Sequence, residues 1–169
     1  MGARRNIGEL ETAMREKTLV DGMPQDKQPL PRSPECVVQL RCASLPSVFG
    51  LIADHYWFVL FEDTGACHRW EVWQTSDAGG RSVGHVHCDL KDPDDDVGGG
   101  STRIAAEWRD AQAHRLRDVL KRPEAYPHCH WYRYWPGPNS NTFAAWVLRE
   151  AGVEYPLGRR AIGRKFLGR

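Results

Sequence analysis

Three stretches in the first half of the chain have the apolar and polar patterning of β-strands. Glu35–Cys42 (ECVVQLRC) is the first, and Asp54–Glu62 (DHYWFVLFE) has the aromatic and β-branched composition typical of strands. Cys67–Gln74 (CHRWEVWQ) alternates, and it follows the turn residues Asp63–Gly65. We therefore predict that the second and third stretches form a β-hairpin.

The second half of the chain contains two helical patterns. In Ser101–Lys121 the apolar residues recur at intervals of three and four, which is the period of an amphipathic helix, and Pro123 ends it. A second helix is expected from about Asn139 to Ala151, with Gly152 at its end. The sequence thus places its helices after most of its strands.

Other segments fill the space between these elements. Ser82–Leu90 is predicted to be a strand with His85 and His87 on one face. The acidic, glycine-rich Asp92–Gly100 is predicted to be a solvated loop, and the aromatic Ala125–Trp135 is predicted to be extended. Strands followed by helices indicate an α+β domain with an antiparallel sheet and flanking helices.

The domain organisation follows from composition. Residues 1–34 are polar and contain four prolines, so we predict a mobile arm that does not join the core. Residues 35–169 are long enough for one domain with its own core, and they end in a basic tail.

Charge, hydropathy and cysteine content exclude several classes of protein. The net charge of +1 does not favour a nucleic-acid partner, and no apolar run is long enough for a transmembrane segment. The N-terminus lacks the apolar stretch of a signal peptide, so we expect a cytoplasmic protein unless a dedicated system exports it. The five cysteines have no CxxC spacing, which argues against a disulfide framework or a zinc ribbon. No cofactor is predicted, and no motif indicates an oligomeric state.

Ser140 is the first candidate for a chemical role. It lies in the turn Pro136–Phe143 (PGPNSNTF), where the second helix begins. A helix N-terminus offers unpaired N–H groups and a positive dipole end, which would stabilise the oxyanion formed when a nucleophile attacks a carbonyl. The alternative is that Ser140 is only a helix N-cap, a role for which serine is among the preferred residues.

A serine nucleophile needs a base, and two histidines are candidates. His55 leads into one strand of the predicted hairpin and His68 lies on the other, so we expect them to lie close to each other across the pair. One imidazole would then act as the base and the second would orient it. The alternative is that both are ordinary polar residues at strand ends.

The order of these residues resembles that of circularly permuted papain-like proteins of the NlpC-type superfamily, which includes the lecithin–retinol acyltransferase group. In that group the nucleophile lies in an Asn-Cys-Glu-His-Phe motif, which Asn139–Phe143 (NSNTF) matches at the Asn, the nucleophile and the Phe. The resemblance implies a permuted papain-like domain with His55 as general base, His68 as orienting residue and Ser140 as nucleophile. The chain also resembles an uncharacterised bacterial family with the signature WPGPNSNTF, over about residues 37–168.

The resemblance implies a hydrolase or acyltransferase that acts on an amide or ester carbonyl of a peptide, a cell-wall amide or a lipid. The nucleophile position holds serine instead of cysteine, so Ser140 needs a stronger base, or the site has kept only binding. Asn139 and Asn141 are candidate oxyanion donors. The expected pocket walls are Tyr56, Trp57 and Trp135.

Two other functions remain open at this point. One is a binding module without catalysis, in which Ser140 only caps its helix. The other is a metal-binding protein that uses His85 and His87, because two imidazoles on one strand face suit zinc or iron. A carboxylate such as Glu71 or Asp89 would complete that metal site.

Overall fold

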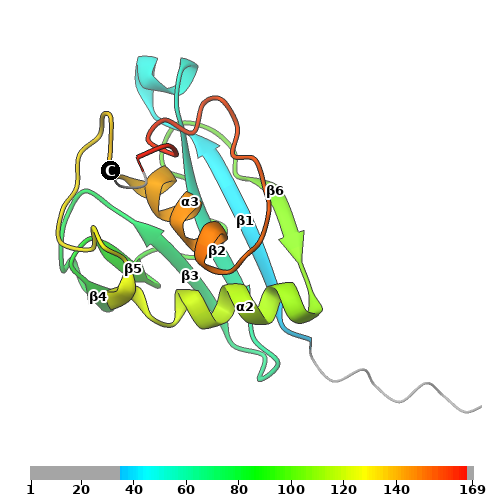
Figure 1. Ribbon diagram of the computed structural model, residues 1–169. Helices are drawn as coiled ribbons and strands as arrows, with labels where there is room; N and C mark the ends of the chain where they lie inside the picture. Colours follow the sequence, from blue (N-terminus) through cyan, green and yellow to red (C-terminus); the bar gives the residue numbers. More distant parts are fainter. Residues whose placement is uncertain (1–34, 167–169) are drawn as a thin grey trace, which may run out of the picture. The chain divides into compact units, whose positions relative to one another are not determined.

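The computed structural model describes residues 35–166, so the arm predicted for residues 1–34 and the end of the basic tail lie outside the described part (Figure 1). A six-stranded antiparallel sheet has the order β4-β5-β3-β2-β1-β6. Together with two α-helices it gives an α+β fold, as predicted. Among the described residues, no helix has the length and hydropathy that crossing a bilayer requires.

The elements follow one another in an order close to the predicted one. The strands are β1 (Val37–Ser44), β2 (Asp54–Phe61), β3 (Cys67–Val72), β4 (Arg81–Val83), β5 (Val86–Cys88) and β6 (Arg103–Trp108). The α-helices are α2 (Asp110–Leu120) and α3 (Ser140–Glu150), and short 3-10 turns occur at η1 (Ser47–Leu51) and η2 (Pro123–Ala125). The hairpin of β2 and β3 and the C-terminal helix α3 are confirmed.

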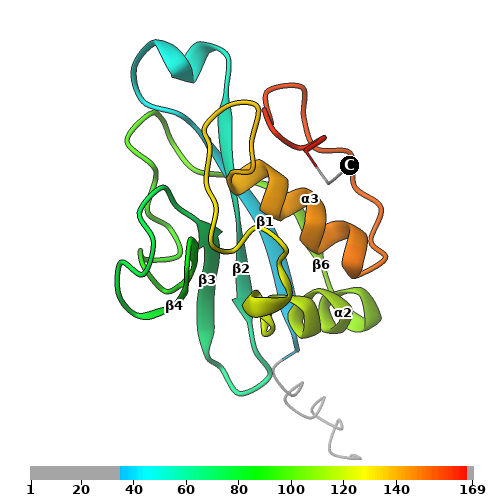
Figure 2. The ribbon, with the colours of Figure 1, turned by 60° about the vertical axis from the view of Figure 1, so that its left-hand side comes forward.

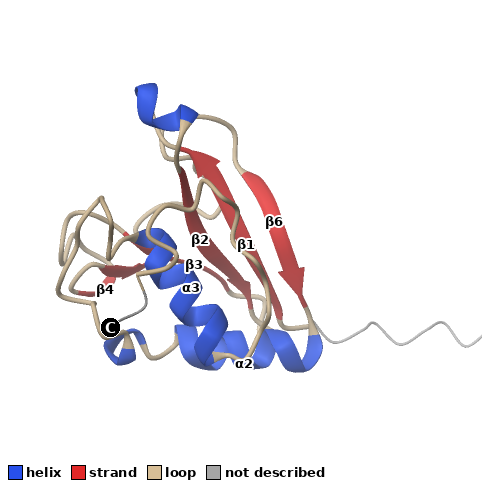
Figure 3. Ribbon diagram, turned by 45° about the horizontal axis from the view of Figure 1, so that its top comes forward, coloured by secondary structure: helices blue, strands red, loops and turns tan. Residues whose placement is uncertain are grey.

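The two faces of the sheet are covered differently. Both α-helices lie against one face (Figures 2 and 3), where α3 contacts β2 and β3 and α2 contacts β1. Even-numbered residues of the central strands point to this face because side chains alternate along a strand. They form the main core with the helices, and include Val38, Leu40, Cys42, Phe58, Leu60, Trp70 and Val72.

The second face carries charged side chains that are buried. Arg41, Arg69 and Glu71 are less than 9 % exposed there, and the segment 91–100 crosses over them. Arg69 Nη1 donates to the carbonyl oxygens of Asp92 and Asp95 at 2.8 and 2.7 Å. The acidic segment is exposed at its aspartates, as expected for a solvated loop, but two of its backbone carbonyls accept from Nη1 of a buried guanidinium.

The helix predicted over Ser101–Lys121 is wrong in its first part. Residues 103–108 form the edge strand β6 on β1, and α2 begins only at Asp110, whose φ is 51°. Ile104 and Trp108 are four residues apart, a spacing that fits the period of a helix and also that of a strand. Pairing with the open edge of β1 satisfies backbone groups of both strands, which decides between the two.

The single strand predicted over Ser82–Leu90 is instead the tight hairpin of β4 and β5. Val83 pairs with Val86, so Gly84 and His85 form the turn. Gly84 has a φ of 57°, a conformation that glycine adopts at little cost, and a Cβ there would collide with the carbonyl of Cys129. His85 therefore belongs to a turn and does not share a strand face with His87.

The extended conformation predicted for Ala125–Trp135 is also wrong. The segment folds into successive turns, in which Cys129 N–H donates to the Tyr126 carbonyl and Trp131 N–H donates to the His128 carbonyl. The Tyr126 ring is buried against α3, whereas Trp135 is 73 % exposed. Strand composition was misleading here because these aromatic residues pack in different places, Tyr126 on α3 and Tyr132 on His85 of the β4–β5 hairpin.

Candidate active site

A pocket of about 690 Å³ lies at the end of the sheet where β2 begins and where β1 and β3 end. Its walls come from the segment around η1, from the loop before α3 and from the first turn of α3. Most lining side chains are apolar or aromatic, and they include Leu45, Phe49, Ile52, Trp73, Val97, Tyr132, Tyr134, Trp135 and Ile162. The polar lining residues are Asp54, His55, Gln74, Asn139, Ser140 and Asn141.

Large apolar side chains surround the pocket and remain exposed to solvent. Phe49 and Ile52 of the η1 segment are 62 % and 59 % exposed. Tyr134 and Trp135, from the loop before α3, are 62 % and 73 % exposed. Such a gathering of exposed apolar residues is typical of a surface that meets an apolar ligand or partner.

Ser140 is the first residue of α3, but it is not the cap. Asn139 is the N-cap: its Oδ1 accepts from the N–H groups of Asn141 and Thr142, and the Thr142 hydroxyl accepts from the Asn139 N–H. This capping box leaves the Ser140 hydroxyl without a structural partner among the described residues. The Ser140 N–H has no hydrogen-bond partner there either, so it is a backbone donor available to a ligand.

Asn141 fastens the start of α3 to the start of β2. Its Nδ2 donates to the carbonyl oxygens of Asp54 and Ile162 at 2.9 and 2.8 Å, which uses both of its amide protons. Asn139 Nδ2 donates to the Tyr134 carbonyl at 2.9 Å. The two asparagines therefore position the helix start. Among the described residues, the Ser140 N–H and the second Asn139 Nδ2 proton have no hydrogen-bond partner.

His55 forms a buried hydrogen bond with a carboxylate. Its Nε2 lies 3.1 Å from Glu71 Oε2, and the two residues are 5 % and 0 % exposed. Burial would raise the pKa of the Glu71 carboxyl, but the hydrogen bonds and charges of His55 and Arg69 outweigh it and hold the pKa below its usual value. The carboxylate thus fixes the orientation of the imidazole and leaves Nδ1 without a partner in the described part of the chain.

Arg69 completes this buried array by donating to the same Glu71 oxygen that His55 contacts. Its Nη2 donates to Glu71 Oε2 at 2.9 Å, and its guanidinium lies 4.4 Å from the centre of the Trp57 ring. Both Arg69 and Glu71 are completely buried. Because a buried carboxylate is costly unless it is paired, Arg69 is what allows Glu71 to stay ionised beside His55.

The expected contact between His55 and His68 is not formed. A hairpin in which Phe58 pairs with Trp70 places His68 opposite Leu60. Partners in this register are both odd or both even in number, so the odd His55 and the even His68 point to opposite faces of the sheet. Instead, His68 Nδ1 lies 2.9 Å from Asp89 Oδ2, at the edge of the helix-covered face.

Ser140 and His55 line the same pocket, but no hydrogen bond joins them in this structure. The His55 Nε2 atom is taken by Glu71, and Nδ1 has no partner among residues 35–166. Catalytic hydrogen bonds are often long without substrate and shorten when it binds. The pocket therefore contains a hydroxyl at a helix start and an imidazole held by a buried carboxylate, without a hydrogen bond between the hydroxyl and the imidazole.

The predicted wall residues have separate places. Trp135 lines the pocket, whereas Tyr56 lies in the core under the helices and burial raises its pKa to about 12. Trp57 is completely buried on the second face and supports Arg69, so it contributes to the array without lining the pocket.

The predicted metal ligands His85 and His87 do not converge. His87 is completely buried, and its two ring nitrogens lie 2.7 Å from Ser82 Oγ and 2.9 Å from the Thr75 carbonyl. Burial lowers the pKa of His87, which keeps it neutral in these hydrogen bonds. His85 Nδ1 lies 2.9 Å from the Trp73 carbonyl. Both histidines serve the fold of the β4–β5 hairpin.

Glu71 should make the stability of the protein depend on pH. The pKa of Glu71 in the folded protein is below its value of about 4.3 in the unfolded chain. The ionised carboxylate therefore adds its full contribution to the free energy of unfolding above about pH 4.3. This contribution is lost as the pH falls through the folded pKa. We expect the stability difference between wild type and Glu71→Gln, from urea denaturation, to shrink as pH is lowered through this range. A difference that stays constant with pH would show that Glu71 is not ionised in the folded protein.

Comparison with known proteins gives a family but no activity. The family described as "Protein of unknown function (DUF3750)" matches residues 35–166, which is most of the chain and includes every residue of the pocket. Neither the curated proteins nor the solved structures contain a match. The matched segment coincides with the part of the chain that forms the sheet, the helices and the His55–Glu71–Arg69 array. The chain therefore belongs to the DUF3750 family of proteins of unknown function.

Proposed function

We propose that this protein is a hydrolase or acyltransferase that attacks an ester or amide carbonyl with Ser140. The observation that carries this proposal is that His55, held by the buried Glu71, and Ser140, at the start of α3, line one pocket. A base oriented by a third group and a hydroxyl at a helix N-terminus are the groups that nucleophilic catalysis needs. Here His55 reaches the pocket from the second face of the sheet and Ser140 reaches it from the helix-covered face.

The chemistry assigns one step to each group. His55 Nδ1 removes the proton from Ser140 Oγ as the oxygen bonds to the carbonyl carbon, and the carboxylate of Glu71 stabilises the resulting imidazolium. The Ser140 N–H donates to the oxyanion. When the carbon–leaving-group bond breaks, His55 returns the proton to the departing oxygen or nitrogen. Water or an acceptor hydroxyl then attacks the acyl-serine, with His55 again as the base.

The lining of the pocket favours an apolar acyl group over a peptide or a cell-wall amide. Exposed Phe49, Ile52 and Trp135 extend an apolar surface from the pocket to solvent. A peptide or cell-wall amide would need charged or hydrogen-bonding groups along the same path, because unpaired polar groups are costly to desolvate. The favoured substrate is therefore a lipid ester or another ester with a long acyl chain.

The order of the elements supports the resemblance to permuted papain-like domains. The base opens β2, the orienting group lies on the adjacent β3, and the nucleophile opens a late helix packed on these strands. Glu71 takes the role that the resemblance gave to His68. We therefore propose a permuted papain-like domain in which a glutamate orients the histidine.

A binding module without catalysis is the second candidate, and one observation favours it. Ser140 Oγ and His55 share no hydrogen bond within the described part of the chain. In that case the apolar pocket would hold an acyl chain, and the His55–Glu71 pair would serve only the fold. The enzyme and the binding module would hold the same kind of ligand, but only the enzyme would convert it to product.

Hydrolysis of p-nitrophenyl esters with acyl chains from acetyl to decanoyl tests the proposal. We expect kcat/KM to rise with chain length until the pocket is filled, by up to about fourfold per methylene, because each buried CH₂ contributes about 0.8 kcal/mol. Phe49→Asp should flatten this dependence and leave acetyl-ester hydrolysis unchanged. Hydrolysis no faster than that of Ser140→Ala, with binding of a fluorescent fatty acid retained, would support the binding module instead.

A further inference from the structure

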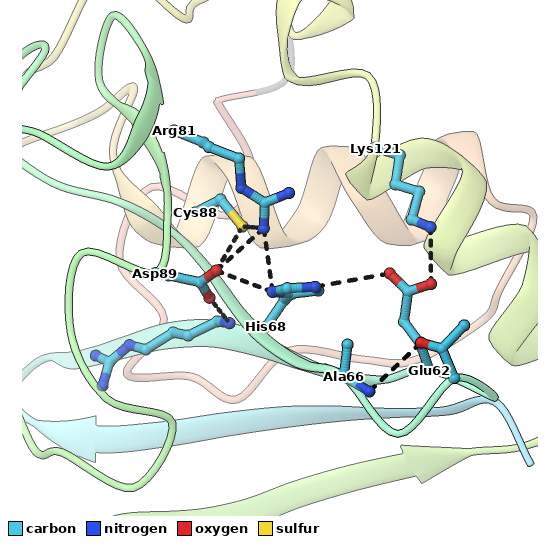
Figure 4. Close-up of polar contacts among 9 residues, drawn as sticks. Glu62, Ala66, His68, Arg81, Cys88, Asp89 and Lys121 are labelled. Carbon is cyan, nitrogen blue, oxygen red and sulfur yellow. Dashed lines mark hydrogen bonds and ion pairs between the residues drawn. The ribbon is translucent and has the colours of Figure 1, made fainter. Parts of the chain in front are cut away.

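A second group of reactive side chains lies away from the pocket, at the edge of the sheet formed by β3, β5 and β4. His68 comes from β3, Cys88 ends β5, and Asp89 follows it (Figure 4). The atoms His68 Nδ1, Cys88 Sγ and Asp89 Oδ2 all lie within 4.8 Å of one another. Among the described residues, this is the group of three whose atoms could hold a metal ion.

The guanidinium of Arg81 lies where the three side chains converge. Arg81 Nη2 is 3.0 Å from His68 Nδ1, 2.9 Å from Cys88 Sγ and 3.0 Å from Asp89 Oδ2 (Figure 4). An Nη2 atom carries two protons, so it cannot donate to all three at once. Asp89 Oδ2 also accepts from the Cys88 thiol at 3.4 Å and lies 2.9 Å from His68 Nδ1. A metal ion at this point would replace these contacts with bonds to the imidazole nitrogen, the thiolate sulfur and the carboxylate oxygen.

The surrounding contacts hold the three side chains in place without Arg81. Asp89 Oδ1 accepts from the Arg69 N–H at 2.8 Å. The second ring nitrogen of His68, Nε2, lies 3.8 Å from the carboxylate of Glu62 (Figure 4). A histidine that ligates zinc commonly turns its other nitrogen to a carboxylate in this way, which orients the ring and raises its basicity.

Arg81 differs from these groups in its freedom to move away. Its side chain is 61 % exposed, whereas Cys88 is completely buried and His68 is 23 % exposed. The guanidinium can move into solvent and leave one nitrogen, one sulfur and one oxygen ligand within 4.8 Å of one another. Imidazole, thiolate and carboxylate are the ligands that zinc takes in proteins, with water in any remaining position.

We propose that His68, Cys88 and Asp89 form a zinc site, and that Arg81 occupies the position of the ion when zinc is absent. Binding would join β3 to the β4–β5 hairpin and displace the Arg81 side chain into solvent. The Cys88 thiol would release its proton as the Sγ–metal bond forms. This site does not depend on Ser140, so it can be tested whether or not the pocket is catalytic.

The test is titration of the chelator-treated full-length protein with Co²⁺, followed by zinc competition against a chromogenic chelator. We expect one ion per chain and a thiolate-to-cobalt charge-transfer band. Asp89→Asn and His68→Gln should weaken zinc binding by at least about tenfold, and Arg81→Gln should strengthen it by a similar factor because no cation must be displaced. His114→Gln, on the exposed side of α2, and Cys67→Ser are matched controls that should bind as wild type.

Three results would overturn the proposal or part of it. The first is a charge-transfer band of equal strength in Cys88→Ser, provided that circular dichroism shows this variant to be folded. The second is zinc affinity unchanged in both His68→Gln and Asp89→Asn, which alter partly exposed side chains and keep the core intact. The third is Arg81→Gln binding zinc no more tightly than wild type, which would overturn the part of the proposal in which Arg81 occupies the position of the ion.

Discussion

Ser140→Ala is expected to lower ester hydrolysis by at least about 10³-fold, because removing the nucleophile from a covalent mechanism leaves only binding and oxyanion stabilisation. The same change should alter the free energy of unfolding by less than about 1 kcal/mol, because Asn139 and Thr142 form the capping box and the Ser140 hydroxyl has no partner among the described residues. Steady-state kinetics and urea denaturation of the same preparation measure both effects.

Two further variants give this prediction its controls. Ser101→Ala changes an exposed serine outside the pocket and should behave as wild type in both measurements. Ser140→Cys should keep or raise activity, since a thiol ionises more readily than a hydroxyl. Hydrolysis that persists unchanged in Ser140→Ala would remove Ser140 from the mechanism.

Arg69→Met is expected to have the largest effect on stability. It removes the guanidinium from a fully buried pair and leaves the Glu71 carboxylate without its charge partner, a change that typically costs about 3–5 kcal/mol. It also releases the Asp92 and Asp95 carbonyls that Arg69 holds. Urea denaturation at neutral pH measures the loss, and Arg117→Met on α2 is a control for removing an arginine that does not belong to this array.

The double variant Arg69→Met/Glu71→Gln shows how much of the lost free energy of unfolding comes from the ion pair between Arg69 and Glu71. If the two charges interact directly, the double variant should be more stable than the sum of the single changes implies, by about 1 kcal/mol or more. Additive effects would mean that Arg69 acts through the segment 91–100 and not through Glu71. That result would weaken the argument that Arg69 keeps the carboxylate beside His55 ionised.

The elements with one dominant local signal could be predicted from the sequence. The hairpin follows from the turn Asp63–Gly65 between two strand-like stretches, and α3 follows from polar capping residues before an apolar helix and Gly152 after it. Residues 103–108 had no such signal, because the four-residue spacing of Ile104 and Trp108 fits both a helix and a strand. The open edge of β1 decides their conformation, and only the assembled sheet contains that edge.

Some residues of the candidate site could be predicted from the sequence, and others could not. Ser140 and His55 stand out locally, as a hydroxyl at a helix start and a histidine at a strand start. Glu71 was missed as the partner of His55, although counting back from a turn centred on Thr64 places Trp73 opposite His55 and Glu71 on the same face. The role of Arg69 could not be read locally, because the segment 91–100 that pairs with it lies far along the chain.

The central claim is that His55 activates Ser140, and labelling with a fluorophosphonate probe tests it most directly. Peptide mass mapping of the labelled wild type should place the adduct on Ser140, and His55→Gln should lose it while remaining folded by circular dichroism. Ser101→Ala, the matched control, should label as wild type. An adduct on another serine, or equal labelling of Ser140 in His55→Gln, would contradict the claim. No labelling of a folded wild-type protein would instead favour the binding module.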